Sequence, residues 1–124
     1  MKPVILVVED DPHLRLALEW SLAADYEVLS AENGRVAMTR FEQHSDQIEA
    51  VITDIEMPKM NGLELIIWLE SRDANMPIIA ISDIVDQPKS IQLRQRPELI
   101  WQPKPFSLVQ IKEALGQVLK VEGR

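Results

Sequence analysis

The hydrophobic residues of this chain follow two alternating patterns. Short apolar stretches, typical of strands buried in a sheet, occur at residues 4–8, 27–31, 50–53, 77–81 and 99–101. Between them, apolar residues recur at spacings of three and four, which indicates amphipathic helices. These helices are expected at residues 12–24, 35–44 and 88–95, and from residues 62 and 107 onward. Alternating strands and helices predict an α/β fold, in which helices cover both faces of a parallel sheet.

Local signals refine this picture at several positions. Asn33 precedes a glycine at the expected start of one helix, and Ser107 is a favourable N-cap for the last one. Trp20 and Trp68 are expected to be packing residues of their helices. Residues 84–98 show no clear periodicity and contain two prolines, so their structure is the least predictable from the sequence.

Length and composition narrow the class of protein. A chain of 124 residues predicts one domain over residues 1–124. The absence of cysteine excludes a disulfide framework and a thiolate metal site. No apolar run is long enough to span a membrane and no signal-peptide pattern is present, so a cytoplasmic location is expected. The net charge of −7 argues against nonspecific nucleic-acid binding.

The segment at residues 51–62 is the one around which the candidate chemistry is organised. It begins as a short strand and places Asp54 where the strand gives way to a loop. Pro58, Asn61 and Gly62 are turn-forming residues, so a tight loop is expected. Residues 1–62 contain 12 acidic and 5 basic residues, so this loop belongs to the acidic half of the chain. This excess fits a cation site, although a solvated acidic face would have the same composition.

Other polar residues follow the remaining strands. Glu9 and Asp10 come after the first, Ser82 ends the fourth, and Lys104 follows the fifth. Parallel strands end at one edge of a sheet, so these residues are expected to converge on Asp54. Three close carboxylates require a cation or a proton, and Mg²⁺ prefers such oxygen ligands. An aspartate, Mg²⁺, a lysine and a hydroxyl are together suited to phosphoryl transfer to a carboxylate.

Simpler interpretations exist for each of these residues. Glu9 and Asp10 could cap the following helix while also binding metal, and Asp11 is expected to be a cap or a solvated acid. Ser82 could be an ordinary residue at a strand end, and Lys104 could be a surface lysine. The combination of all these residue types at successive strand ends favours a site.

These motifs together resemble the receiver domain of two-component response regulators. They are the sequence Val-Val-Glu-Asp-Asp at residues 7–11, the segment at residues 54–62, Ser82, and Lys-Pro-Phe at residues 104–106. The resemblance covers essentially the whole chain. It implies a flavodoxin-like, doubly wound, five-stranded parallel sheet in the order 2-1-3-4-5, with helices on both faces.

The resemblance also implies the phosphoacceptor and the metal ligands. Asp54 would accept a phosphoryl group from a phosphohistidine and become a phosphoaspartate. Asp10, Asp54 and the backbone carbonyl of Glu56 would bind Mg²⁺ directly, and Glu9 would act through water. The domain would not be an enzyme in the usual sense, because it would catalyse only its own phosphorylation and a slow autodephosphorylation.

A phosphorylation switch is implied as well. Lys104 would contact the acyl phosphate, next to a cis peptide bond before Pro105. Ser82 would turn inward to the phosphoryl oxygen, and Trp101 would occupy the aromatic switch position, although it could also be a plain core residue. The affected surface would comprise the fourth helix, the fifth strand and the fifth helix, near residues 83–107.

The implied partners are proteins. The phosphoryl group would come from a histidine kinase or a histidine phosphotransfer protein, and the switched surface would act on a downstream protein target or an output domain. The resemblance also allows a phosphorylation-dependent homodimer. Neither direct nucleic-acid binding by this domain nor membrane binding is expected. With no output segment after the last helix, the chain is expected to be a single-domain regulator or the receiver part of a longer protein.

Three features depart from the family pattern. Asp83 follows Ser82 where a small residue is usual, and its carboxylate would repel a phosphate if it pointed inward. Glu56 adds an acidic side chain beside the site, at a position that influences phosphoaspartate hydrolysis in this family. Residues 96–98 replace a usual glycine-containing turn, and Arg96, together with Lys89 and Arg94, would make the output surface basic.

Three other functions compete with a phosphorylated receiver. One is a phosphorylation-independent protein-binding module of the same fold, which Asp83 and the unusual fourth helix would motivate. Another is a metal-dependent phosphatase with Asp54 as nucleophile and Glu56 as acid, although the chain has no cap domain to enclose a substrate. A dinucleotide-binding fold is disfavoured because no glycine-rich loop follows the first strand.

Overall fold

The computed structural model describes residues 2–57, 60–83 and 96–121. The five predicted strands are all present in this part of the chain, and four of the five predicted helices are found there. The helix expected at residues 88–95 lies outside the described residues. In chain order the elements are β1 (Val4–Val8), α1 (Pro12–Leu22), β2 (Glu27–Ala31), α2 (Gly34–His44), β3 (Ile48–Asp54), α3 (Gly62–Arg72), β4 (Ile78–Ser82), β5 (Leu99–Pro103) and α4 (Leu108–Val121).

The strands form one parallel sheet in the order β2-β1-β3-β4-β5. This confirms the flavodoxin-like, doubly wound topology. In this order β2 lies on one side of β1 and the remaining strands lie on the other, so the direction of strand addition reverses between β1 and β3. Val8 at the end of β1 is paired with Thr53 near the end of β3. The residues that follow this pair, Glu9 and Asp54, therefore lie next to each other at the switch point, where open α/β sheets bind ligands.

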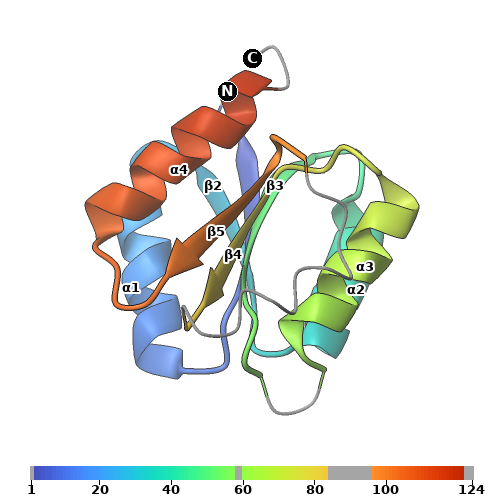
Figure 1. Cartoon of the computed structure of the whole chain (residues 1–124), viewed down its shortest axis with the longest axis horizontal. Coiled ribbons are helices and arrows are strands. Elements are labelled where there is room, and N and C mark those ends of the chain that lie inside the picture. The colour runs from blue at the N-terminus through green and yellow to red at the C-terminus, as the bar shows by residue number, and fades with distance from the viewer. Residues whose placement is uncertain (1, 58–59, 84–95, 122–124) are drawn as a thin grey trace.

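Helices cover both faces of the sheet (Figure 1). Helices α1 and α4 lie against one face, and α2 and α3 against the other. Successive strand residues point to opposite faces, so Leu6 and Val8 join the core under α2 and α3, whereas Ile5 and Val7 join the core under α1 and α4. This two-sided burial explains why the strands are continuously apolar. No helix in the described part of the chain is long and apolar enough to cross a membrane.

Side-chain caps fix the start of every described helix. Asp11 Oδ1 accepts a hydrogen bond from the backbone N–H of His13, and Asn33 and Asn61 cap α2 and α3 in the same way. Ser107 Oγ accepts from the Gln110 N–H, which confirms the predicted cap of the last helix. The loops before the helices follow the carboxyl ends of the strands, so these caps also hold the loops that carry the site.

The expectation for Trp20 was wrong, because its side chain is 75% exposed. Helix α1 buries Leu18 and Leu22, and a residue two positions from Leu18 points about 200° away around the helix. Trp68 does pack as expected. Its ring meets Phe41 edge-on at 5.7 Å between centroids, joining α3 to α2.

Candidate functional site

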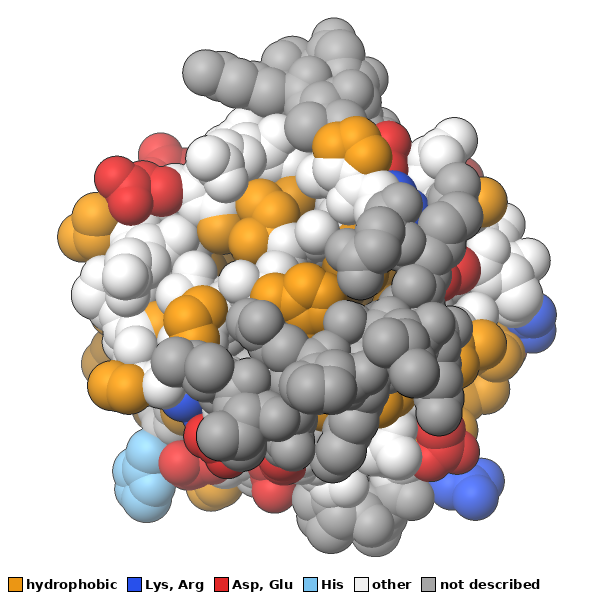
Figure 2. Space-filling view, in the orientation of Figure 1, with side chains coloured by type: hydrophobic (Ala, Val, Ile, Leu, Met, Phe, Trp, Pro, Cys, Tyr) orange, Lys and Arg blue, Asp and Glu red, His pale blue; other side chains and the backbone are white. Residues whose placement is uncertain are grey.

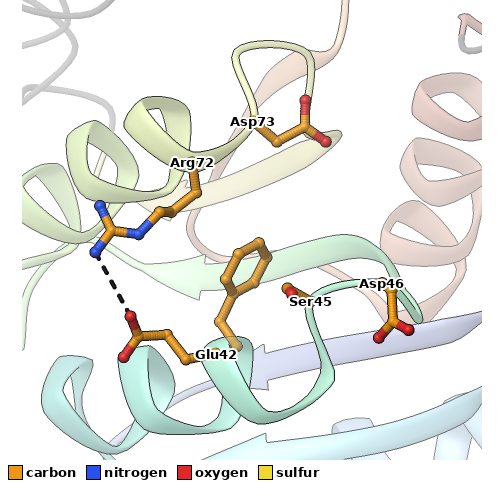
Figure 3. Close-up of a pocket in the computed structure, with 6 residues that line it drawn as sticks. Glu42, Ser45, Asp46, Arg72 and Asp73 are labelled. Atoms are coloured by element: carbon orange, nitrogen blue, oxygen red, sulfur yellow. Dashed lines mark ion pairs between the residues drawn. The ribbon is translucent and has the colours of Figure 1, made fainter.

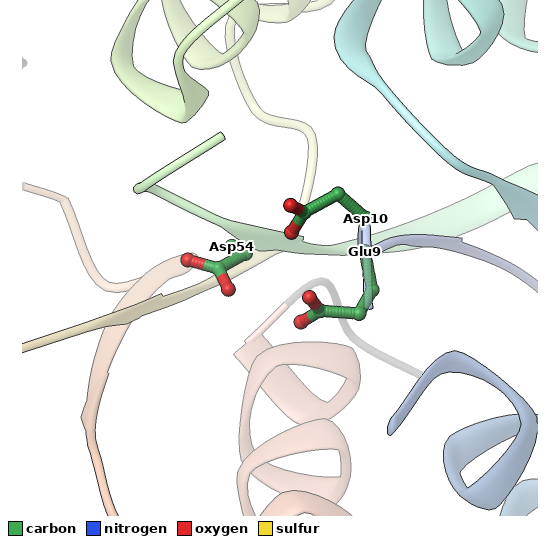
Figure 4. A group of neighbouring side chains, drawn as sticks. All are labelled: Glu9, Asp10 and Asp54. Atoms are coloured by element: carbon green, nitrogen blue, oxygen red, sulfur yellow. The ribbon is translucent and has the colours of Figure 1, made fainter. Parts of the chain in front are cut away.

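Three carboxylates meet at the carboxyl-terminal edge of the sheet. Glu9 and Asp10 follow β1, and Asp54 is the last residue of β3. One carboxylate oxygen from each lies within 4.8 Å of the others, and the Glu9 and Asp10 side chains point toward Asp54 (Figure 4). Glu9 and Asp54 are both 2% exposed, whereas Asp10 is exposed. Acidic side chains also gather along the lower edge of the molecular surface in the same view as Figure 1 (Figure 2).

Lys104 supplies the positive charge that this cluster needs. Its Nζ lies 3.0 Å from Asp54 Oδ2 and 3.5 Å from Glu56 Oε1. Partial burial lowers the pKa of Lys104, but the hydrogen bond to Asp54 and the surrounding carboxylates outweigh this effect and raise the pKa above its ordinary value. The ammonium group is therefore charged at neutral pH. The peptide bond between Lys104 and Pro105 is cis, as the resemblance implied.

Ser82 and Glu56 complete the polar lining of the site. Ser82 Oγ donates a hydrogen bond to Glu56 Oε2 at 3.0 Å, and it also lies 3.0 Å from the backbone carbonyl oxygen of Asp83. The contact between Glu56 and Ser82 was not anticipated, since the two residues are 26 positions apart in the sequence. Asp83, the next residue, is exposed.

Burial raises the pKa of Glu9 to about 8, and the nearby charge of Asp54 contributes in the same direction, although a hydrogen bond from the Asp11 N–H opposes the shift. Glu9 Oε1 is buried and has no hydrogen-bond partner among the described residues. A buried carboxyl oxygen without a hydrogen-bond partner is energetically unfavourable, and a cation bound between the three carboxyl groups would compensate for it. Hard cations such as Mg²⁺ prefer oxygen ligands of this kind. The Glu9 backbone is held by Arg15, whose Nη1 donates to the Glu9 carbonyl oxygen at 2.8 Å.

The shifted pKa of Glu9 predicts how the stability of the chelator-treated protein depends on pH. Since the pKa is about 8 in the folded state and 4.5 ordinarily, stability from this group is present below pH 4.5 and is lost as the pH rises through 8. Glu9→Gln is neutral throughout, so we expect it to stabilise the protein by on the order of 2 kcal/mol at pH 9 and little at pH 4. Urea unfolding in EDTA would measure this difference.

The exposed Glu64 provides the control for this experiment, because Glu64→Gln removes the same charge from the surface. We expect Glu64→Gln to shift the unfolding curve about equally at both pH values. A Glu9→Gln variant with the same pH dependence as wild type would show that Glu9 is not the buried acid responsible.

The loop after Asp54 is held by close backbone contacts. The Glu56 N–H donates to Asp54 Oδ1 at 2.9 Å, and the Gly62 N–H donates to the Ile55 carbonyl oxygen at 2.8 Å. A Cβ atom at Gly62 would lie 2.6 Å from Ile55 Cα and would collide with the Asp54 carbonyl oxygen. Glycine is needed here for space, since the start of α3 packs directly on the backbone of the loop.

Two residues near β5 differ from their expected surroundings. Arg96 was expected on a basic surface, but its side chain is 3% exposed and pairs with Glu70 at 2.6 Å and Glu98 at 3.5 Å. The expected surface therefore does not include Arg96, and Lys89 and Arg94 lie outside the described residues. Trp101 is half-buried against the core under α2 and α3, and its Nε1–H is buried with no acceptor among the described residues.

Surface hollows lie near both ends of the sheet in the described part of the chain. One, of about 570 Å³, adjoins the site between α1 and the start of α4, and is lined by Leu14, Ala17, Asp83, Lys104, Pro105, Phe106 and Leu108. The other, of about 500 Å³, lies at the carboxyl ends of α2 and α3 (Figure 3). Its rim carries an exposed ion pair between Arg72 and Glu42 at 3.6 Å. The strand ends that carry the carboxylates are at the opposite edge of the sheet from this second hollow.

Comparisons with known sequences give a consistent result. The sequence model of the response regulator receiver domain matches residues 5–116. The chain is 33% identical over 118 residues to the chemotaxis protein CheY of Thermotoga maritima, a match that covers 94% of this chain and 97% of that protein. It is 32% identical over 118 residues to the C4-dicarboxylate transport transcriptional regulatory protein DctD of Pseudomonas aeruginosa, covering 94% of this chain. The chain spans only 25% of the length of DctD.

Solved structures show the same fold. A receiver domain protein from Clostridium thermocellum superposes with a TM-score of 0.89, at 22% identity, over 98% of this chain and 97% of that one. A response regulator receiver protein from Sinorhizobium medicae superposes with a TM-score of 0.82, at 27% identity, over 96% of this chain and 95% of that one. Sequence, topology and the acidic strand ends agree, and the chain belongs to the response regulator receiver domain family of two-component signalling proteins.

Proposed function

We propose that Asp54 is the phosphoacceptor of this receiver domain and that it takes its phosphoryl group from a phosphohistidine of a histidine kinase or a histidine phosphotransfer protein. The observation that carries this proposal is the pairing of a buried Asp54 carboxylate with Lys104 Nζ at 3.0 Å, beside the carboxylates of Glu9 and Asp10. The ion pair with Lys104 holds the buried Asp54 carboxylate in one orientation, as an attacking nucleophile requires.

The transfer is a single displacement at phosphorus. An oxygen of Asp54 forms the new P–O bond while the P–N bond to the donor imidazole breaks, and its electron pair stays on the imidazole nitrogen. Lys104 stabilises the negative charge on the phosphoryl oxygens, and the Ser82 hydroxyl donates a further hydrogen bond to them.

Mg²⁺ is the cofactor that we propose for this reaction. Asp10, Asp54 and the backbone carbonyl of Glu56 would hold it, and Glu9 would act through a water molecule. The all-oxygen donor set and the unpartnered Glu9 Oε1 fit this ion. When bound, Mg²⁺ would offset the repulsion between the carboxylates and the incoming phosphoryl oxygens.

Phosphorylation is proposed to change the surface that includes β5 and α4. Ser82 would turn toward the phosphoryl group, and Trp101 would move with it. The indole N–H of Trp101 supports this step, because a buried donor with no acceptor among the described residues loses little when its ring moves to another position. A downstream protein or an output domain would read the new surface, and a phosphorylation-dependent dimer is one form that this readout could take.

The relatives support protein partners for this reaction. They include the transcriptional regulatory protein DctD and a sensor histidine kinase, TmoS of Ectopseudomonas mendocina, of which this chain matches 12% of the length. Both of these proteins are much longer than the matched segment, so the kinase partner, the output domain and the cytoplasmic location of this chain are proposed rather than shown. Residues 1–124 are proposed to form a single receiver domain.

Intact-mass measurement with a small-molecule phosphodonor tests this function. We expect one phosphoryl group on the wild type in Mg²⁺, none in EDTA, and none on Asp54→Asn, which keeps the side-chain shape but cannot form an acyl phosphate. Beryllofluoride binding in the presence of Mg²⁺ would separate rapid hydrolysis from an inert site. A folded wild-type protein that neither gains mass nor binds beryllofluoride would contradict the proposed function.

A further inference from the structure

We infer that the Glu56 carboxylate competes with the phosphoryl group for the same two donors. In the unphosphorylated protein Glu56 binds Ser82 and Lys104, and it must release both when Asp54 is phosphorylated. This inference rests on the proposed function and adds a residue that limits how readily the site is occupied. It is carried by contacts of the Glu56 side chain, which differ from the metal contact proposed for its backbone carbonyl.

The geometry shows which groups Glu56 holds. One carboxylate oxygen, Oε2, accepts from Ser82 Oγ at 3.0 Å, while the other, Oε1, lies 3.5 Å from Lys104 Nζ. These two donors come from the ends of β4 and β5. A single carboxylate therefore bridges the hydroxyl and the ammonium group that would otherwise face an anion on Asp54.

The two donors cannot serve both anions equally. Ser82 has one hydroxyl proton, so it can donate to Glu56 or to a phosphoryl oxygen at one time. Lys104 already donates to Asp54 at 3.0 Å, and a phosphoryl group there would add negative charge within a few ångströms of Glu56. The phosphoryl group and the Glu56 carboxylate would repel each other at this distance, because both are negatively charged.

Glu56 is placed so that it can leave. Its side chain is 34% exposed, in contrast to the nearly fully buried Asp54. A rotation toward solvent would therefore rehydrate the carboxylate without opening the core. Ser82 also retains a local acceptor after Glu56 departs, because the Asp83 carbonyl oxygen lies 3.0 Å from its hydroxyl oxygen. The unphosphorylated site thus keeps its donors ordered, while the resident carboxylate weakens binding of any external anion.

The test is the affinity for beryllofluoride, measured by calorimetry at fixed Mg²⁺ with the full chain. Beryllofluoride imitates a phosphoryl group on Asp54 without requiring a phosphodonor. Glu56→Gln removes the charge and keeps the side-chain length, and we expect it to bind beryllofluoride about tenfold more tightly, which lies between the effects of one unit charge at roughly 5 Å in bulk water and near a protein surface. Glu56→Ala should also bind more tightly, and both variants should be phosphorylated faster by a small-molecule donor.

Glu64→Gln is the matched control, since it removes one carboxylate from the first turn of α3 outside the contacts of Ser82 and Lys104. Its affinity should stay within about twofold of wild type, because exposed charges are screened. Equal or weaker binding by both Glu56 variants, with wild type binding normally, would overturn the inference alone. If wild type and variants neither bind beryllofluoride nor gain mass with the phosphodonor, the proposed function is wrong, and the inference is wrong with it. Thermal unfolding would confirm that each variant is folded.

Discussion

Replacing Arg96 with methionine is expected to lower the free energy of unfolding by about 3 kcal/mol. The substitution leaves Glu70 and Glu98 largely buried and without the guanidinium group that both of them contact. The Arg96 side chain is 3% exposed, and those of Glu70 and Glu98 are 15% and 16% exposed. Methionine fills a similar space, so the loss would report the missing charge rather than a cavity. Urea unfolding at neutral pH would measure it.

The ion cluster also links separate elements of the fold. Glu70 belongs to α3, and Arg96 and Glu98 lie just before β5, where the Ile78 N–H donates to the Glu98 carbonyl oxygen at 2.8 Å. Removing Arg96 should therefore loosen the start of β5. The combined change Arg96→Met with Glu70→Gln should recover part of the lost stability, since it removes one of the unpaired charges.

Arg72 offers the control for the Arg96 experiment. Its ion pair with Glu42 is 3.6 Å long, and the two side chains are 46% and 61% exposed. Arg72→Ala is expected to cost less than about 1 kcal/mol, even though the guanidinium also lies over the Trp68 ring, because water competes for both contacts. Similar losses for Arg96→Met and Arg72→Ala would contradict the role assigned to burial.

The second large effect is expected at Gly62. An alanine there would bring Cβ to 2.6 Å from Ile55 Cα and into the Asp54 carbonyl oxygen, and both are backbone atoms that cannot rotate away. We expect Gly62→Ala to cost about 3 kcal/mol of unfolding free energy, at the upper end of overpacking effects. The displaced loop carries the Asp54 and Glu56 backbone, so phosphorylation of the folded fraction should fall as well.

Gly116 provides a glycine-to-alanine change without a clash. It lies inside α4, and no heavy atom is within 4 Å of a Cβ placed there. Gly116→Ala should stabilise the protein by about 1 kcal/mol, because alanine restricts the unfolded chain and favours the helix. The two variants should thus move the urea midpoint in opposite directions. A Gly62→Ala protein as stable as wild type would show that the loop has room that the structure does not indicate.

Much of the fold follows from short-range information. The apolar runs identify the strands, the three-and-four spacing identifies the helices, and Asp11, Asn33 and Ser107 mark helix starts. Each of these signals involves residues within about one helical turn or one strand, so it can be recognised in the sequence without knowing how the elements pack. The strand order came from the resemblance to receiver domains, because the alternating pattern alone allows other parallel arrangements.

The acidic centre of the site was also readable from the sequence. Residues directly after parallel strands share one edge of the sheet, which is why the sequence alone groups Glu9, Asp10 and Asp54. The same reasoning predicted that Lys104, which follows the fifth strand, lies close to Asp54, and the two side chains are in contact. Each of these positions depends only on where a strand ends, and that is the feature that an apolar run specifies best.

Tertiary packing decided the partners and the exposure of individual side chains. Trp20 is apolar but lies on the outer side of α1, and Arg96 is charged but lies inside an ion cluster with α3. The bridge from Glu56 to Ser82 and Lys104 joins residues 26 and 48 positions apart, and the need for glycine at residue 62 comes from the approach of α3 to the loop. The sequence by itself determined the order of elements and the chemistry at the strand ends, because both are set by neighbouring residues. Only the tertiary structure decided which distant side chains touch, because that depends on how helices settle against the sheet.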